Sequence, residues 1–235
     1  MTAEQLSDNF DELMNFIQSK FKGERLDQLV NLYTELAPRI ATAPASSKKQ
    51  YHNAFEGGYV LHVLNVIKAC EKVSGVWEDM GMIPNFTKEE MYFSALNHDL
   101  GKIGTMTEDY YIPCEEEWMK KKGQVFVTNP KLQYMKVPER SLMLLQANGI
   151  SISEVEYLSI KLHDGLYEDS NKAYFINYSE DMALKSNLPY ILHQADLICA
   201  KMEGQTSTTT SVKKTTIKAE AVKTGNRTLD KFLNE

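Results

Sequence analysis

Apolar side chains recur every three or four residues through most of the chain, which is the spacing of amphipathic helices. Near the N-terminus this spacing is shown by Leu6, Phe10, Leu13 and Phe16. The same pattern returns in residues 25–43, 57–77, 87–100, 138–149, 153–165 and 179–203. The pattern therefore predicts an all-α fold, with Pro189 starting a separate segment of the last helical region.

Local signals support several of these helix ends. Two pairs of residues have the spacing of a capping box, in which each side chain bonds the other's backbone N–H: Thr87 with Glu90, and Ser153 with Glu156. Gly101 and Gly165 are placed to end the two helices that these pairs open.

Two stretches break the helical pattern. Between Lys102 and Pro138 the sequence is rich in aromatic and β-branched residues around a Lys-Gly turn, which predicts a loop with a short hairpin. Residues 204–235 contain eight threonines and few large apolar groups, which predicts a flexible tail. We expect N-terminal helices over residues 1–45 that pack on the core, a main helical domain over 46–203, and this tail.

Composition places the chain among soluble globular proteins. Of its 235 residues, 43% are hydrophobic and 25% charged, which is ordinary for that class. No apolar run approaches the ~20 residues of a membrane span, and the acidic N-terminus lacks the features of a signal peptide. The three cysteines are far apart and form no CxxC pair, which disfavours a thiolate metal site or a disulfide framework. We expect a cytoplasmic protein with no membrane partner.

The net charge is unevenly distributed along the chain. Residues 204–235 hold six basic and three acidic side chains, a net charge of +3. Because the whole chain carries −6, residues 1–203 carry −9. Broad binding to a nucleic-acid backbone needs clustered Lys and Arg, so an acidic body argues against it. A small nucleotide, or a strand end held by a metal, stays compatible with this charge.

Three of the five histidines have an aspartate nearby. His98 and His163 are each followed directly by an aspartate, and His193 precedes Asp196 by three residues. Imidazole and carboxylate together suit Mn, Fe, Co, Ni or Zn and disfavour an ion such as Ca, which prefers oxygen ligands alone. Each residue also has a structural explanation, as a hydrogen-bonded core histidine, a helix-end cation or a local polar pair.

Helix geometry limits how these residues can meet. His98 and Asp99 point about 100° apart on a helix, so they can share one ion only near the helix end. His193 and Asp196 lie on one helical face and can line one cavity. All the candidates are near helical stretches, which favours a site inside a helical bundle.

The segments GGYVLH, NHDLGK and LHQAD, in this order, resemble the HD-domain metal-dependent phosphohydrolases over about residues 50–203. The strongest local resemblance is to the HD domain of 3′–5′ exoribonucleases. It implies an HD-domain helical bundle with one or two divalent ions, which are Mn, Fe, Co, Ni or Zn, with Mg as a further possibility. It also implies that Asp99 can bridge two ions, and that the ligands of the first ion are His62, His98, Asp99 and Asp196.

The chain departs from those relatives in two respects. They carry His-His-Gly where this chain has His163-Asp164-Gly165, so only His163 matches the pair, as a second ligand or a phosphate contact. Their nucleic-acid-binding OB domain has no counterpart here.

The remaining candidates are assigned by their chemistry. Asp99 can orient an attacking water, and Lys102 can contact a phosphate or serve as a helix-end cation. His52 and His193 are candidates to protonate a leaving oxygen or hold a phosphate. The residues expected to act in catalysis are Asp99, Lys102, His163 and His193. The residues expected to contact substrate are His52, Lys102, His163, Tyr111 and Lys172.

The function that follows is a metal-dependent phosphohydrolase that cleaves phosphoesters of nucleotides through a metal-activated water. Three alternatives stay open: a single-strand 3′–5′ exonuclease, a cyclic-nucleotide or alarmone hydrolase, and a metal-binding regulatory protein. The last would act through residues 226–233, which resemble a sliding-clamp-binding peptide. The oligomeric state is open.

Overall fold

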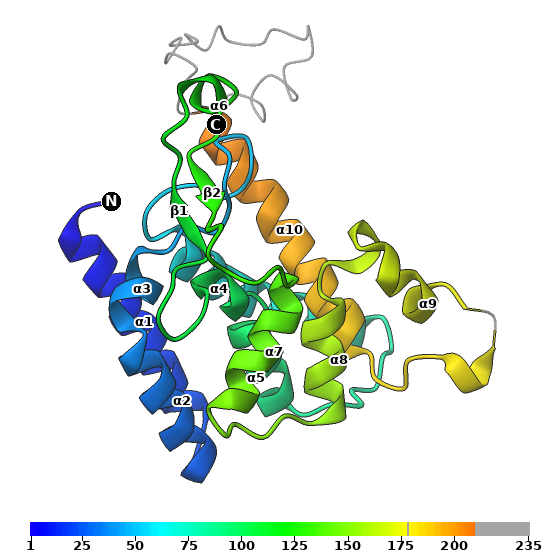
Figure 1. Cartoon of the computed structure of the whole chain (residues 1–235). Coiled ribbons are helices and arrows are strands. Elements are labelled where there is room, and N and C mark those ends of the chain that lie inside the picture. Colours follow the sequence, from blue (N-terminus) through cyan, green and yellow to red (C-terminus); the bar gives the residue numbers. More distant parts are fainter. Residues whose placement is uncertain (178, 210–235) are drawn as a thin grey trace, which may run out of the picture.

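The computed structural model describes residues 1–177 and 179–209, which form a mostly helical molecule (Figure 1). The prediction of an all-α chain is confirmed. In the described part, the α-helices are α1 (Ala3–Lys20), α2 (Gly23–Glu35), α3 (Ala37–Thr42), α4 (Gly58–Asp79), α5 (Lys88–Asn97), α6 (Glu117–Lys121), α7 (Val137–Ala147), α8 (Glu154–Leu162), α9 (Lys172–Phe175) and α10 (Leu188–Thr209). Short 3₁₀ helices are η1 (Leu100–Ile103), η2 (Gly165–Tyr167), η3 (Asp169–Asn171) and η4 (Glu180–Met182).

Side-chain caps fix where the site-bearing helices begin. Both predicted capping boxes are present: Thr87 caps α5 together with Glu90, and Ser153 caps α8 together with Glu156. Each box satisfies backbone N–H groups that the first helical turn leaves without a partner, and a single cap contributes about 0.5–2 kcal/mol. These caps fix the N-terminal ends of the two helices whose C-terminal ends carry the His-Asp pairs.

The centre of the fold is the pair α4 and α10, which pack along each other and against α5 and α8. Helix α4 is buried over most of its length. Its residues Val60, Val63 and Ile67 belong to the same buried hydrophobic cluster as Leu192 of α10. Each fully buried side chain of this size contributes roughly 1.5–3 kcal/mol. The two histidine-bearing segments of α4 and α10 are therefore held inside a rigid core.

Helices α1, α2 and α3 pack against this core through α4 and share its hydrophobic cluster. Tyr33 of α2 is buried, and its hydroxyl lies 3.2 Å from the carbonyl oxygen of Leu96 and 3.1 Å from Oδ1 of Asn97. These contacts connect the N-terminal helices directly to the end of α5. The N-terminal helices thus support the segment that carries His98.

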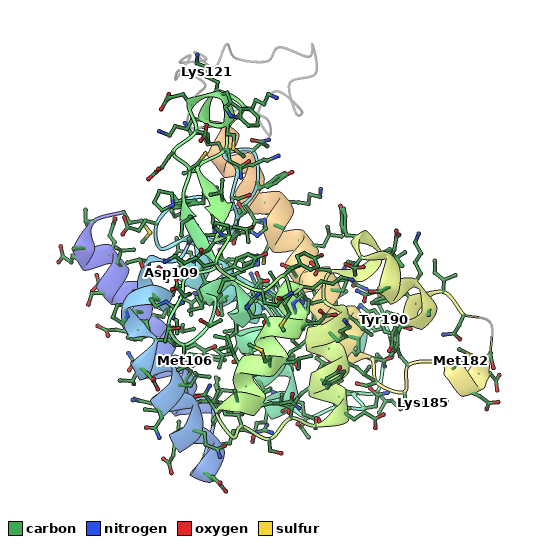
Figure 2. All side chains as sticks on the ribbon, viewed as in Figure 1. Met106, Asp109, Lys121, Met182, Lys185 and Tyr190 are labelled. Carbon is green, nitrogen blue, oxygen red and sulfur yellow. The ribbon has the colours of Figure 1, made fainter. Side chains whose placement is uncertain are left out.

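The strands form a small projection. Strand β1 (Tyr111–Pro113) pairs antiparallel with β2 (Phe126–Thr128), as the sequence predicts, with Ile112 opposite Val127. Helix α6 lies between the strands, where the sequence predicted only a turn, and Figure 2 shows Lys121 at the tip of this projection.

The helical pattern over residues 25–43 is broken near Pro38, as this proline predicts: Leu36 is the C-cap of α2 and the N-cap of α3. Other helix boundaries differ from the predictions. Helix α5 ends at Asn97, and the 3₁₀ helix η1 follows before Gly104. Helix α10 continues to Thr209, six residues past the predicted end of the main domain at 203, because Gly204 only weakens a helix interior and does not end this one.

Two further predictions concern the C-terminal peptide and membrane-spanning helices. The proposed clamp-binding peptide, residues 226–233, lies outside the described residues. Among the helices of the described ranges, none has the length and apolar character that crossing a membrane requires.

Candidate metal centre

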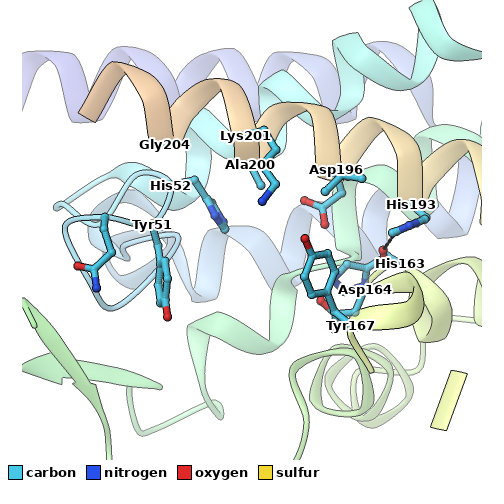
Figure 3. A pocket seen from close by; sticks show the side chains of 12 residues that line it. Tyr51, His52, His163, Asp164, Tyr167, His193, Asp196, Ala200, Lys201 and Gly204 are labelled. Carbon is cyan, nitrogen blue, oxygen red and sulfur yellow. Dashed lines mark hydrogen bonds and ion pairs between the residues drawn. The ribbon is translucent and has the colours of Figure 1, made fainter. Parts of the chain in front are cut away.

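Three elements deliver the predicted metal ligands to one place. His62 comes from the N-terminal part of α4, His98 and Asp99 follow the end of α5, and Asp196 comes from α10. The end of α8 adds His163, which Figure 3 shows near Asp196. These residues are far apart in the sequence, and they meet because α4, α5, α8 and α10 pack together around them.

The side chains converge closely. Nε2 of His62 lies 3.0 Å from Oδ1 of Asp196 and 3.4 Å from Nε2 of His98. Oδ2 of Asp99 is 3.5 Å from both of these imidazole nitrogens. The other oxygen of Asp99, Oδ1, lies 3.5 Å from Nε2 of His163. Asp99 therefore stands between two sets of donors, with one oxygen directed to each.

The second nitrogen of each histidine is engaged by an acceptor behind the centre. Nδ1 of His62 lies 2.9 Å from Oε2 of Glu203, and Nδ1 of His98 lies 2.8 Å from the carbonyl oxygen of Ala95. Nδ1 of His163 is likewise 2.8 Å from a backbone carbonyl oxygen, that of Ile160. A neutral imidazole whose Nδ1–H donates to such an acceptor presents its Nε2 lone pair forward, as metal-binding histidines do.

The charge states differ sharply among the three histidines. Burial lowers the pKa of His98 to about 4. Burial also acts to lower the pKa of His62, but hydrogen bonds to Asp196 and Glu203 outweigh it and raise the pKa to about 9. The pKa of His163 is raised to about 10, because the charges of Asp164 and Asp99 outweigh burial. Without a metal, protons on two histidines balance the buried carboxylates.

Lys102 supplies a further positive charge at the centre. Its Nζ lies 2.5 Å from Oδ2 of Asp99, and both side chains are largely buried. Burial alone would raise the pKa of Asp99, but Lys102 and the neighbouring histidines hold it well below its usual range. Asp99 is therefore an ionised carboxylate, which is the protonation state that a metal ligand requires.

The glycine of the NHDLGK segment permits a close approach between elements. A Cβ at Gly101 would lie 2.2 Å from the carbonyl oxygen of Val137, so α7 can pack against η1 only because this residue has no side chain. The backbone N–H of Gly101 also donates to Oγ of Ser141, at 2.7 Å. The sequence predicted that Gly101 ends α5, but the helix ends earlier, at Asn97. Gly101 instead fixes the position of the turn that carries Asp99 and Lys102.

The predicted catalytic residue His193 lines a cavity beside the centre and also contacts the backbone of the segment that carries His163. Its Nδ1 is 2.8 Å from the carbonyl oxygen of His163, and a Cβ at Gly165 would lie 2.1 Å from its Cε1. The helix predicted to end at Gly165 ends at Leu162 instead, and Gly165, at φ +57°, begins η2 and accommodates the His193 ring. His193 fixes the loop that follows His163.

Two cavities open onto the centre and share four lining residues, His52, His163, Asp164 and Asp196. The larger, of about 510 Å³, extends along α10 past Ala200 towards Gly204. The smaller cavity, of about 260 Å³, is lined by Lys102 and Asp99 among other residues. The centre is thus accessible to a ligand although His62 and His98 are fully buried.

The predicted substrate contacts divide into three groups. His52 lines both cavities, with its ring centroid 4.6 Å from that of His62 and burial lowering its pKa to about 3. Tyr111 lines a neighbouring cavity of about 320 Å³ together with Lys102. Lys172 lines none of these cavities, and its ammonium instead pairs with Asp169 at the start of α9. The prediction that Lys172 contacts substrate has no support in this arrangement.

Sequence reasoning missed Glu203 and Asn65, which lie behind His62. One oxygen of Glu203 meets Nδ1 of His62, and the other accepts from Nδ2 of Asn65 at 2.7 Å. A signal was available, since Glu203 follows Asp196 by seven residues, which is two helical turns. A carboxylate behind a metal-binding histidine fixes its ring and raises its basicity.

These donors fit a divalent metal ion. One ligand atom from each of His62, His98 and Asp99 lies within 4.8 Å of the others, and all three residues are buried. Comparison of the chain with protein-family models, curated proteins and solved structures gave no match. The assignment of a candidate metal centre therefore rests on the convergence of these side chains.

Proposed function

We propose that the protein is a metal-dependent phosphohydrolase of the HD-domain type that cleaves phosphoester bonds of nucleotides. One observation carries this proposal. The imidazoles of His62, His98 and His163 each have Nδ1 bonded to an acceptor and Nε2 directed to the carboxylates of Asp99 and Asp196. Both carboxylates are ionised and line a cavity. A purely structural polar cluster would not need a cavity next to it.

The proposed ligands are His62, His98, Asp99 and Asp196, with His163 on the far oxygen of Asp99. When bound, a divalent metal lowers the pKa of a water and offsets negative charge on phosphoryl oxygens. Imidazole and carboxylate ligands favour Mn, Fe, Co, Ni or Zn. Asp99 then holds the water in orientation by accepting its hydrogen bond.

Lys102 has a second role in this proposal. The Lys102 ammonium contacts Oδ2 of Asp99 and lines the cavity beside the centre. From this position it would donate a hydrogen bond to a phosphate in that cavity. His52, which is neutral at pH 7 and lines both cavities, can donate a hydrogen bond to a phosphoryl oxygen.

The test is phosphate release by the whole chain, stripped of metal and refilled in turn with Mn, Fe, Co, Ni, Zn and Mg. The substrates are nucleoside mono- and triphosphates, cyclic nucleotides and short single strands. We expect turnover with at least one transition metal. We expect Asp99→Ala and Asp99→Asn to lower kcat/KM at least about 1,000-fold, because the site loses the group that orients the water and binds the metal.

Asp27→Ala is the matched control, since Asp27 is an exposed aspartate of α2 far along the chain from every ligand. Circular dichroism of each variant distinguishes lost chemistry from lost folding. Trimming of single strands alone would favour the nuclease alternative. Stoichiometric metal binding without turnover of any substrate would contradict the proposal and favour a regulatory metal-binding protein.

A further inference from the structure

The larger cavity beside the centre has two chemically distinct ends. One end is the metal centre itself, with His163 and Asp196. The other end extends about two turns along α10 and is lined by Tyr51, Tyr167 and Lys201. Its volume of about 510 Å³ falls in the range of small-molecule sites. The phosphate chemistry proposed above uses only the first end, so the second needs its own explanation.

Two tyrosines stand at the second end. Figure 3 shows the rings of Tyr51 and Tyr167 on either side of the space below Ala200 and Lys201. Tyr167 is 76% exposed and Tyr51 is 49% exposed. Exposed aromatic faces on a cavity wall are suited to stack on a planar ring. Tyr167 also ends η2, only four residues after His163, so its ring is tied to the segment that carries a centre residue.

Two small residues of α10, Ala200 and Gly204, face the cavity one turn apart, beside Lys201. Glycine disfavours a helix interior relative to alanine, yet a Cβ at Gly204 would make only an ordinary contact, 3.9 Å from the carbonyl oxygen of Gln50. Packing among the described residues therefore does not require glycine there, whereas a ligand lying against the helix would benefit from it.

Lys201 adds a cation to the same end. Its Nζ lies 6.0 Å from the centroid of the Tyr167 ring, a cation–π contact that orients both groups. A cation beside an aromatic face suits a heteroaromatic ring that carries oxygen and nitrogen acceptors. It suits an aliphatic or cationic ligand less well.

We propose that this end of the cavity is a nucleoside-binding subsite, in which a base stacks on Tyr167 while the attached phosphate lies at the centre. This inference rests on the proposed function for the placement of the phosphate. Recognition of the base itself uses only Tyr167, Lys201 and the small residues of α10. The subsite would make the enzyme select nucleotides over phosphate esters that carry no base.

Binding can be tested without any metal or turnover. The probes are adenosine and thymidine, with ribose as the comparison, added to the metal-free whole chain and observed by saturation-transfer NMR. We expect transfer to the base protons of a nucleoside to exceed transfer to its sugar protons. Tyr167→Ala is expected to remove the signal, while Tyr167→Phe keeps it because the aromatic face is retained. Tyr157→Ala, which removes a 43%-exposed tyrosine of α8 that lines none of the cavities described, is the matched control.

Kinetics supply the second measurement. Base stacking predicts that kcat/KM for a nucleoside monophosphate exceeds that for ribose 5-phosphate by about 5- to 150-fold. Tyr167→Ala is expected to lose about the same factor with the nucleotide and to slow ribose 5-phosphate hydrolysis by much less than this factor. This pattern separates base recognition from damage to the centre, which would slow both substrates equally.

The outcomes are distinguishable from failure of the proposed function. Hydrolysis of ribose 5-phosphate as fast as of nucleotides, or full nucleoside binding by Tyr167→Ala, would overturn the subsite while leaving a phosphohydrolase. Nucleoside binding that depends on Tyr167, without hydrolysis of any ester, would retain the subsite and reject the enzyme. Absence of nucleoside binding by the wild-type chain would reject the subsite.

Discussion

The buried centre and the open end of the cavity lie along the same helix but are built in opposite ways. Around His62 and His98, which are fully buried, nearly every polar atom has a partner and the backbone approaches closely at Gly101. Around Tyr167 and Gly204, the side chains are exposed or small and the packing leaves space. One region is fixed before any ligand arrives, and the other is left open.

This difference has a physical reason. A metal site needs ligands held within a fraction of an ångström, which requires supporting hydrogen bonds and a dense surrounding core. An aromatic ring that stacks on a flat ligand needs accessible area instead, because its energy comes from contact made on binding. We therefore expect substitutions at the centre to change metal affinity and stability, and substitutions at the open end to change substrate selection.

The largest effect that sharpens this contrast is expected at Glu203. Glu203→Gln leaves a side chain of the same size but replaces the charged acceptor of the His62 Nδ1–H with a weaker one. We expect metal affinity to fall by about 10- to 100-fold, the usual effect of removing such a supporting group. Isothermal titration of the metal-free protein with Mn²⁺ or Zn²⁺ measures it.

A control for this substitution lies on another helix. Glu12→Gln removes an exposed carboxylate of α1 that pairs with Lys68 at 2.9 Å and lies on none of the elements that carry the metal ligands, so metal affinity is expected to stay unchanged. Equal losses in both variants would mean that general charge, rather than support of His62, governs the site. Unchanged affinity in Glu203→Gln would contradict the supporting role directly.

Two glycine substitutions compare the packing of the regions. Gly101→Ala places a Cβ 2.2 Å from the Val137 carbonyl oxygen, so we expect a loss of about 1–3 kcal/mol in the free energy of unfolding. Gly204→Ala meets only a contact at 3.9 Å, so the better helix propensity of alanine is expected to raise stability by up to about 1 kcal/mol. Urea unfolding of both variants measures the difference. Equal destabilisation would show that the open end is as tightly packed as the centre.

Local signals in the sequence predicted much of the fold. Capping boxes such as Thr87 with Glu90 involve residues three apart, so they can be recognised without knowing the tertiary structure. The contact between His62 and Glu203 spans 141 positions, and the approach of Val137 to Gly101 spans α7 and η1. Such partners depend on how helices pack, which helical periodicity alone does not determine.

The candidate site shows the same division. His62, His98, Asp99 and Asp196 were selected as a set by their resemblance to an ordered motif, and the structure brings them together. Other roles were assigned to single residues by chemical type, which carries no information on direction. In the structure His193 contacts a backbone carbonyl oxygen and also lines the larger cavity, and Lys172 pairs with Asp169, while the predicted roles of both stay predictions.

The smallest expected effect concerns pH and tests whether the centre is proton-balanced when metal-free. His62 has a pKa raised to about 9, so at pH 7 it holds a proton on Nε2 that a metal must displace. Below this pKa the metal and the proton compete, so affinity is expected to rise about tenfold from pH 7 to pH 8 and to stop rising above about pH 9. Calorimetric titrations in two buffers of different ionisation enthalpy count the protons released.

Nucleoside binding at Tyr167 displaces no proton from a metal ligand, so its affinity is expected to change less between pH 7 and pH 8. Metal binding without proton release would mean that His62 is already neutral at pH 7. In that case its hydrogen bonds to Asp196 and Glu203 would not raise its pKa above 7.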